Sequence, residues 1–286
     1  MFKRTAAIFA AAAVTIAAAL TMTAGSAAAA PHAGVTSATP HADVTLASTI
    51  ALDDCSGSLV RYPTSQDSDQ ALMLTAGHCF EGGMPSAGQV LQNVPSSRSG
   101  SLLDASGNTL GTVQADTLLY ATMTNTDVAL YQLTDTYASL ASQYGVTALT
   151  LSASHPTNGD TIAIPSGYWD ETWSCTLNGF AGTVEEDQWT WHDSLRYGLS
   201  GCGVIGGSSG SPVVDTSTGA VVGVNNTINE DGQMCTLNNP CEVAPDGTTT
   251  ETQGQGYGQE TYWFTTCLDA SNSIDLTVAG CLLPKP

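Results

Sequence analysis

The sequence is poor in basic residues. It has 6 Lys and Arg against 26 Asp and Glu in 286 residues, which gives a formal net charge of -20. Binding to a nucleic acid needs clustered Lys and Arg, because these side chains replace the counterions of the phosphate backbone. We therefore expect no nucleic-acid partner. Charged residues are only 11% of the chain and hydrophobic residues are 42%, which favours a folded protein over a disordered one.

Long apolar runs are missing after the first 30 residues. Lys3 and Arg4 precede an Ala-rich apolar run over residues 6–20, and small residues continue to Ala30. This order is typical of a secretory signal peptide, and the run is short for a helix that crosses a bilayer of about 30 Å. We predict that residues 1–30 are removed on export, leaving a secreted protein with no membrane association. Residues 31–47 are predicted to form an N-terminal tail or a short propeptide.

The cysteines lack the spacing of a zinc site, because no Cys-x-x-Cys pair occurs. An exported chain meets an oxidising environment, in which an even number of cysteines favours disulfides. We therefore expect four disulfides, no metal and no cofactor. The eight cysteines are Cys55, Cys79, Cys175, Cys202, Cys235, Cys241, Cys267 and Cys281.

Long helical periodicity is absent as well. Short segments rich in Val, Ile, Leu, Thr and Tyr recur between clusters of Gly, Ser, Asn and Asp, which predicts an all-β barrel or sandwich. Only short helices are expected, within residues 138–144 and 268–278. The predicted strands cover Ala71–Thr75, Gln89–Val94, Thr109–Val113, Asp127–Leu133, Thr161–Pro165, Thr172–Val184, Ala220–Val224 and Glu260–Thr266.

Three short stretches together hold the groups that nucleophilic catalysis by serine requires. They are Leu-Thr-Ala-Gly-His-Cys at 74–79, Asn-Thr-Asp-Val-Ala-Leu at 125–130 and Gly-Gly-Ser-Ser-Gly-Ser-Pro at 206–212. A serine hydroxyl attacks a carbonyl when a neutral imidazole takes its proton, and a carboxylate fixes the tautomer of that imidazole. The three stretches supply the nucleophile, the base and the carboxylate.

The order of these groups along the chain limits the possible architectures. All five histidines precede Ser208, so the Ser-Asp-His order of the α/β-hydrolases is excluded, although residues 206–210 fit the Gly-x-Ser-x-Gly pattern. A subtilisin order, with Asp53 or Asp54 before the histidine, would need alternating strands and helices. His155 and His192 are interpreted as ordinary surface or core residues.

The His-Asp-Ser order, the three motifs and the all-β pattern resemble the trypsin/chymotrypsin-like serine peptidases. This resemblance implies two six-stranded antiparallel β-barrels, at residues 48–145 and 146–286, with a short C-terminal helix. It assigns His78 as the base, Asp127 as the orienting carboxylate and Ser209 as the nucleophile. The backbone amides of Gly207 and Ser209 would form the oxyanion hole.

One departure from the trypsin pattern concerns the residue before the nucleophile. It is the uncharged Ser208 where trypsin-like enzymes carry an Asp that pairs with a newly freed amino terminus. We therefore predict an oxyanion hole formed without that ion pair. The Ser-Gly-Ser-Pro run resembles the bacterial glutamyl endopeptidase branch, although the Gly-Ile-His strand of that branch is Gly-Val-Asn here, at residues 223–225.

The family pattern also points to the residues that select the substrate. It places the base of the primary pocket at the uncharged Gly203, which disfavours substrates with Lys or Arg at the cleavage site. We expect a neutral pocket for apolar or small side chains, or alternatively a polar pocket for Glu. The predicted walls are Val204, Ile205, Asn225, Asn226 and Thr227, with residues 256–258.

The resemblance bears on the disulfides too. The bridge that pins the histidine loop in the family would be Cys55–Cys79 here, and Cys267–Cys281 would tie the final helix to the tail. The other four cysteines allow three arrangements: sequence neighbours, which we prefer, Cys202 with Cys235, or Cys175 with Cys235.

These inferences predict a secreted serine endopeptidase that cleaves proteins or peptides through an acyl-enzyme intermediate. The enzyme is expected to be a monomer. Two alternatives remain open: a secreted binding protein that has the same fold without catalysis, and an esterase that uses the same triad.

Overall fold

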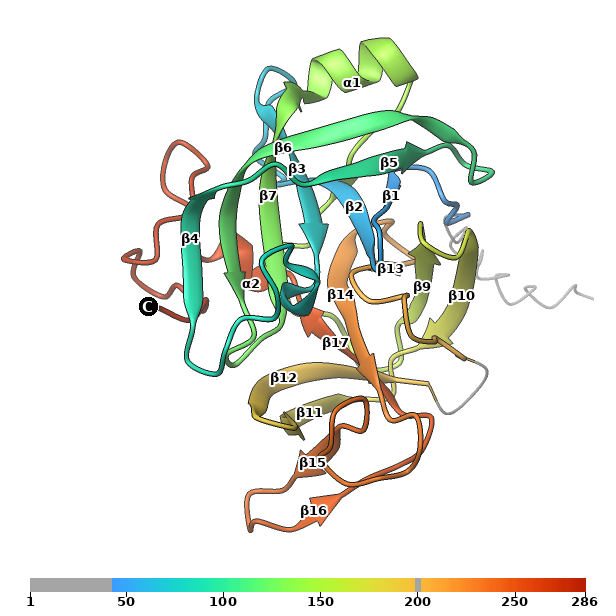
Figure 1. Ribbon diagram of the computed structural model, residues 1–286, viewed down its shortest axis with the longest axis vertical. Helices are drawn as coiled ribbons and strands as arrows, with labels where there is room; N and C mark the ends of the chain where they lie inside the picture. The colour runs from blue at the N-terminus through green and yellow to red at the C-terminus, as the bar shows by residue number, and fades with distance from the viewer. Residues whose placement is uncertain (1–42, 199–201) are drawn as a thin grey trace, which may run out of the picture. The chain divides into compact units, whose positions relative to one another are not determined.

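The computed structural model describes residues 43–198 and 202–286. The predicted signal peptide and most of the segment at 31–47 lie outside these residues. The regular secondary structure of the described chain is almost all β-strand and forms two sheets (Figure 1). Within the described part, no helix has the length and apolar character needed to cross a membrane.

The first sheet closes into a barrel. Its strands run in the order β1-β5-β6-β7-β3-β2, and an additional pairing of β1 with β2 completes a ring of six; β4 pairs with β6, and the short β8 runs parallel to β2. The strands are β1 (Thr49–Ala51), β2 (Ser56–Arg61), β3 (Gln70–Thr75), β4 (Val90–Pro95), β5 (Ser99–Leu103), β6 (Thr109–Thr122), β7 (Val128–Thr136) and β8 (Leu149–Thr150).

The second sheet has nine strands in the order β10-β9-β13-β14-β17-β12-β11-β15-β16, all paired antiparallel. No pairing between described residues closes this sheet into a ring. The strands are β9 (Thr161–Ser166), β10 (Glu171–Thr176), β11 (Phe180–Glu186), β12 (Trp189–Tyr197), β13 (Pro212–Asp215), β14 (Val221–Ile228), β15 (Cys241–Val243), β16 (Thr249–Thr250) and β17 (Gly256–Glu260). The all-β fold class is confirmed: a closed six-stranded barrel, a second sheet and few helices are consistent with a chymotrypsin-like two-barrel fold.

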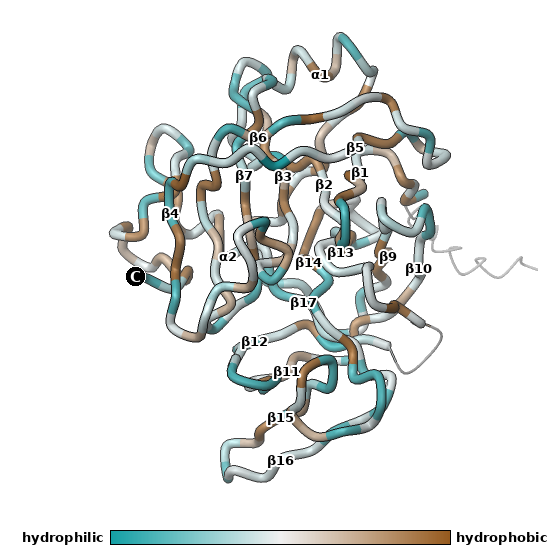
Figure 2. Tube along the Cα trace, in the orientation of Figure 1, coloured by the Kyte–Doolittle hydropathy of each residue, from teal (hydrophilic) through white to brown (hydrophobic). Residues whose placement is uncertain are grey.

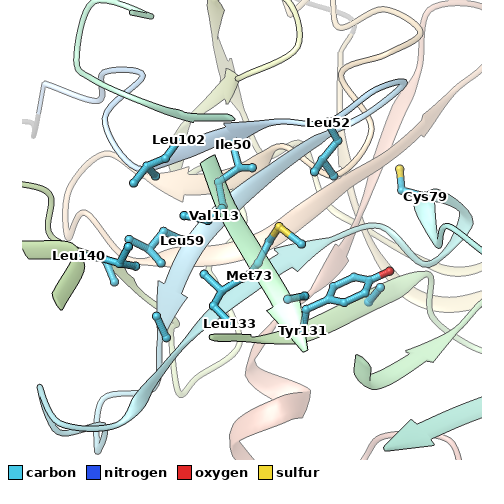
Figure 3. Packing of buried hydrophobic residues seen from close by; sticks show 14 of the residues in the cluster. Ile50, Leu52, Leu59, Met73, Cys79, Leu102, Val113, Tyr131, Leu133 and Leu140 are labelled. Atoms are coloured by element: carbon cyan, nitrogen blue, oxygen red, sulfur yellow. The ribbon is translucent and has the colours of Figure 1, made fainter. Parts of the chain in front are cut away.

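Strand alternation divides the apolar residues between two cores. Successive side chains of a strand point to opposite faces, so Leu59 and Met73 point into the first barrel while Val60 and Leu72 point outward. Figure 3 shows the barrel interior, where these inward side chains meet Leu102, Val113 and Leu133. Hydrophobic residues lie along strands of both sheets, including β4 and β14 (Figure 2).

The outward side chains of the first barrel pack against the second sheet and the C-terminal segment. Val60 and Leu74 share one core with Val214 and Val224 of the second sheet and with Phe264. Burial of apolar surface contributes about 25 cal/mol per Å², so this shared core holds the two sheets together. The two sheets that carry the residues of the candidate site are therefore held against each other.

The helix prediction was right at one position and wrong at the other. Helix α1 (Tyr137–Tyr144) matches the prediction for 138–144, begins with a capping box of Thr136 and Ser139 and ends at Gly145 with φ 68°. Residues 268–278 form turns instead of a helix, because Asp269 and Asp275 accept hydrogen bonds from nearby backbone amides. The short helix is α2 (Tyr262–Thr265), just before them.

Two predicted strands also differ from the structure. The single strand expected over Thr172–Val184 is interrupted by Gly179 at φ 121° and becomes β10 and β11. The strand expected over Glu260–Thr266 is the last residue of β17 followed by α2. The hydroxyl of Thr261 donates to Val221 O at this change of direction, and Phe264 of α2 enters the shared core.

Four disulfides connect all eight cysteines: Cys55–Cys79, Cys175–Cys202, Cys235–Cys241 and Cys267–Cys281. The four cysteines with open pairing thus pair with their sequence neighbours. Disulfides of this number are typical of proteins that mature in oxidising compartments.

Candidate active site

His78 lies on a short 3-10 turn, Gly77–Cys79, directly after β3. The Cys55–Cys79 disulfide fastens this turn to the segment before β2. Gly77 is required here by close packing: a Cβ atom at this position would lie 2.1 Å from Thr122 O and 2.7 Å from Asp127 Oδ1. The glycine therefore allows the histidine turn to approach the carboxylate.

Asp127 is fully buried just before β7, and both of its carboxylate oxygens contact His78. Oδ1 accepts a hydrogen bond of 2.8 Å from the His78 backbone amide, and Oδ2 lies 2.7 Å from His78 Nδ1. A carboxylate accepts hydrogen bonds, so the proton of a neutral imidazole is placed on Nδ1. Nε2 then carries the lone pair that a general base needs.

The loop that carries Asp127 is anchored to the second sheet. Asn125, in a left-handed conformation with φ 59°, bridges to Trp191 of β12, and its amide donates to Thr190 O at 3.0 Å. The Trp191 indole donates to Met123 O at 3.1 Å. Both sheets therefore position the Asp127–His78 pair.

Ser209 lies in the loop that leads into β13. Its carbonyl accepts a 2.8 Å hydrogen bond from the amide of Ser56 on β2, and Gly210, at φ 82°, lets the two chains approach, since a Cβ there would lie 2.1 Å from Ser56 O. The Ser209 hydroxyl donates to Asn226 O at 3.1 Å. Ser209 and His78 line the same cleft, and no hydrogen bond joins their side chains in the described structure.

Backbone amides next to Ser209 are available to bind an anion. Gly207 has φ 89°, and the preceding carbonyl, that of Gly206, accepts a 2.9 Å hydrogen bond from the indole of Trp169. Among the described residues, the amides of Gly207 and Ser209 donate to no protein group. Free amides beside a nucleophile are the donors that an oxyanion hole requires.

A chain of neutral hydrogen bonds holds the residue before Ser209. The buried Ser208 hydroxyl donates to Ile205 O at 2.5 Å and accepts from Asn225 Nδ2 at 3.0 Å. Asn225 Oδ1 in turn accepts from the Tyr197 hydroxyl at 2.7 Å. None of the three side chains is charged, whereas the trypsin pattern has an Asp at the position of Ser208.

Most of the predicted substrate-binding residues line the cleft. Those that do are Val204, Ile205, Asn225, Asn226 and Thr227, together with His78, Asp127 and Ser209. Gly203 is exposed and does not line the cleft, and residues 256–258, also expected as walls, do not line it either.

Sequence analysis did not predict Glu186, a buried carboxylate in the same cleft. It is the last residue of β11 and is only 4% exposed. Its Oε1 accepts a 2.8 Å hydrogen bond from the Asn238 amide, while Oε2 is buried without a hydrogen-bond partner in the described structure. An acidic residue at a strand end is usually a turn residue, so no local pattern marks it.

Burial and charge shift the pKa values of two groups in the cleft. Burial alone lowers the pKa of His78, but the charge and hydrogen bond of Asp127 outweigh it, and Glu186 and Asp54 add to the rise, so the pKa lies above its ordinary value. Burial raises the pKa of Glu186, against the opposing effects of the nearby Thr227 side chain, the Asn238 amide and His78. The cleft therefore favours a protonated His78 to a greater extent than water does.

Comparisons with known proteins point to one family. The family model described as a trypsin-like peptidase domain matches residues 55–224, more than half of the chain. A search of curated proteins finds no match.

Solved structures with similar chains include three bacterial proteases. The MamO protease domain from Magnetospirillum magneticum, in its apo form, has 11% identity and a TM-score of 0.49, covering 79% of this chain and 98% of that chain. The active form of Rv3671c protease from M. tuberculosis has 14% identity and a TM-score of 0.47, and the match covers 85% of each chain. Nocardiopsis protease has 19% identity and a TM-score of 0.42, and the match covers 75% of this chain and 90% of that chain.

The family match covers the strands and loops that hold His78, Asp127 and Ser209. At the level of the family, the activity is that of a serine-type peptidase and the substrates are proteins or peptides. The chain belongs to the trypsin-like peptidase family.

Proposed function

We propose that this protein is a secreted serine endopeptidase in which Ser209, His78 and Asp127 form the catalytic triad. The observation that carries the proposal is the double contact of Asp127 with His78, in a cleft that Ser209 also lines. That contact leaves Nε2 of His78 as the proton acceptor. Buried carboxylate, oriented imidazole and glycine-flanked serine are the three parts that acyl transfer to serine requires.

In the proposed reaction, the Ser209 hydroxyl leaves Asn226 O by rotation about its Cα–Cβ bond and donates to Nε2 of His78. Oγ attacks the carbonyl carbon of the peptide bond as its proton passes to Nε2, and the Gly207 and Ser209 amides stabilise the oxyanion. His78 returns the proton to the leaving amine, which gives an acyl-enzyme. A water molecule, deprotonated by His78, then releases the acid and restores Ser209.

For the substrate we propose a primary pocket with neutral walls formed by Val204, Ile205 and residues 225–227. Glu186 and Glu230 add negative charge to the cleft, and no Lys or Arg lines it among the described residues. The cleft therefore favours peptides that carry a positive charge near the cleaved bond over those that carry a negative one. The four disulfides and the N-terminal sequence pattern support secretion, and we propose a monomer.

A proteome-derived peptide library tests the function directly. Incubation with the purified protein should give new peptide ends with a shared side-chain preference, and an organophosphonate should label Ser209 alone. Folded protein that neither cleaves peptides nor reacts with the phosphonate would identify a non-catalytic binding protein. Labelling with hydrolysis of esters only would identify an esterase.

Replacing Glu186 with Gln should shift the acidic side of the pH profile of kcat/KM to lower pH. The negative charge of Glu186 raises the pKa of His78, and His78 must be neutral to accept a proton, so activity falls as the pH drops through that pKa. Removing the charge lowers the pKa of His78 and preserves activity at lower pH. The pH profile is measured with a neutral peptide. The control is Glu230→Gln, because Glu230 lines the cleft but is not among the groups that shift the pKa of His78. An unchanged acidic side or a shift to higher pH contradicts the prediction.

A further inference from the structure

A second cluster of titratable side chains lies on the second sheet, outside the cleft. It consists of His155, in the segment before β9, Asp193 on β12 and Glu260 at the end of β17. His155 Nε2 lies 2.9 Å from Glu260 Oε1 and 3.5 Å from Asp193 Oδ2. One nitrogen or oxygen atom of each side chain lies within 4.8 Å of the other two. The catalytic proposal uses none of these residues.

The tautomer of His155 is fixed by its other ring nitrogen. Nδ1 lies 2.7 Å from the carbonyl oxygen of Pro156, and a carbonyl can only accept a hydrogen bond. Nδ1 therefore carries a proton, and Nε2 of the neutral ring keeps a lone pair with one oxygen of each of the two carboxylates 2.9 and 3.5 Å away. Lone pairs at these distances repel one another unless a positive charge or a proton lies between them. A histidine that donates from one nitrogen to a backbone carbonyl is also the usual arrangement in metal sites.

Glu260 provides a second, independent observation. Its side chain is 3% exposed, and neither carboxylate oxygen has a hydrogen-bond partner in the described structure, because the short contact of Oε1 with His155 lacks hydrogen-bond geometry. Burying a carboxylate without a partner is costly, and a cation removes most of that cost. This buried carboxylate lies 2.9 Å from Nε2 of His155 and has no hydrogen bond that would offset its burial.

The backbone at Asp193 is unusual as well. Its φ of 53° lies in the left-handed region, within a strand. On either side, Ser194 pairs with Ala181 and His192 with Thr183, so Asp193 lies opposite Gly182 in a continuous register. Strained backbone within a regular strand is uncommon and often accompanies a functional position.

We infer that His155, Asp193 and Glu260 bind one divalent transition-metal ion, with Zn²⁺ as the expected ion. A set of one imidazole and two carboxylates suits zinc, whereas Ca²⁺ and Mg²⁺ prefer oxygen ligands alone. Tetrahedral zinc with bonds of about 2.0–2.2 Å places its ligand atoms about 3.3–3.6 Å apart. The observed separations of 2.9 and 3.5 Å are close to that spacing.

The ion would connect three separate parts of the second sheet: the segment before β9, β12 and β17. His155 and Asp193 are partly exposed, so water can supply the fourth ligand. Its role would be structural stabilisation, which departs from our expectation of a protein without metal. The two other clusters of potential ligands in the described residues each include cysteines that are in disulfides and offer no thiolate.

The test uses the untagged mature protein after dialysis against a chelator. Zinc binding is measured by competition with a chromophoric indicator and by elemental analysis, and thermal unfolding is followed with and without zinc. We expect one Zn²⁺ per chain and a Tm that rises with zinc concentration, since a ligand of the native state stabilises it. Glu260→Gln and Asp193→Asn should each weaken binding by more than about tenfold, while His192→Gln, which changes an exposed histidine next to Asp193, should bind like the wild type.

Cobalt gives a second readout that does not depend on stability. Co²⁺ in the wild-type protein should show visible absorption bands of a four-coordinate site, and Asp193→Asn should lose them, even if Glu260→Gln fails to fold. A wild-type protein that takes up no stoichiometric zinc would overturn the inference. Equal affinity in wild type and Asp193→Asn would also overturn it and would identify the cluster as an ion pair only.

Discussion

Ser209→Ala is expected to lower kcat by about 10⁶-fold while the protein stays folded. The substitution removes the only atom proposed to bond to the substrate carbonyl, and no neighbouring hydroxyl can replace it, because the Ser208 hydroxyl is held by Ile205 and Asn225. The loss for folding is one hydrogen bond to Asn226 O, worth about 1 kcal/mol. Single-turnover cleavage of a peptide and urea unfolding measure the two effects.

Ser211→Ala is the matched control for this substitution. Ser211 lies two residues away in the same loop, and its hydroxyl is buried without a hydrogen-bond partner in the described structure. Its removal should leave kcat within about tenfold of the wild type, because it contacts none of the proposed reacting groups. Similar losses for the two variants would place the nucleophile elsewhere.

Asp127→Asn is expected to lower kcat by about 10⁴-fold. The asparagine oxygen can still accept from the His78 amide, but its NH₂ group then faces Nδ1 of His78 and requires that atom to accept a hydrogen bond. The imidazole proton moves to Nε2, which can no longer take the proton of Ser209. Asparagine has the same shape as aspartate, so we expect a large loss of kcat with little change in the packing around residue 127.

The double variant Asp127→Asn/Ser209→Ala gives the sharper test. If the residues act as one unit, removing Asp127 adds almost nothing once Ser209 is gone. Full multiplication of the two losses, or a loss below about tenfold for Asp127→Asn alone, would contradict the triad. Far-ultraviolet circular dichroism and Tm confirm that each variant is folded.

The members of the proposed site could be named from the sequence, but their contacts could not. The motifs around His78 and Asp127 identify a base and a carboxylate, and the structure brings them to 2.7 Å. The hydrogen bond of Ser209 to Asn226 depends on a side-chain rotation, which has no sequence signal. Gly203 was expected in the pocket from a count along the chain, and the local path of the loop leads it outside.

Sequence analysis missed the sites that form from residues far apart in the chain. Glu186 enters the cleft because β11 pairs with β12, whose Trp191 is in turn fixed to the Asp127 loop. His155, Asp193 and Glu260 meet only because two strands, β12 and β17, and the segment before β9 fold together. None of these contacts leaves a local pattern, since each residue by itself looks like a polar turn or surface position.

The sequence by itself determined the all-β class, the excess of negative charge and the three motifs in their order. These are local properties: strand alternation, turn residues and short motifs are set by neighbours in the chain. The tertiary structure alone decided that the first sheet closes while the pairings between described residues leave the second open, and which carboxylates are buried. The reason is that burial and strand partners depend on how both faces of each sheet are covered, and distant segments such as α2 supply that cover.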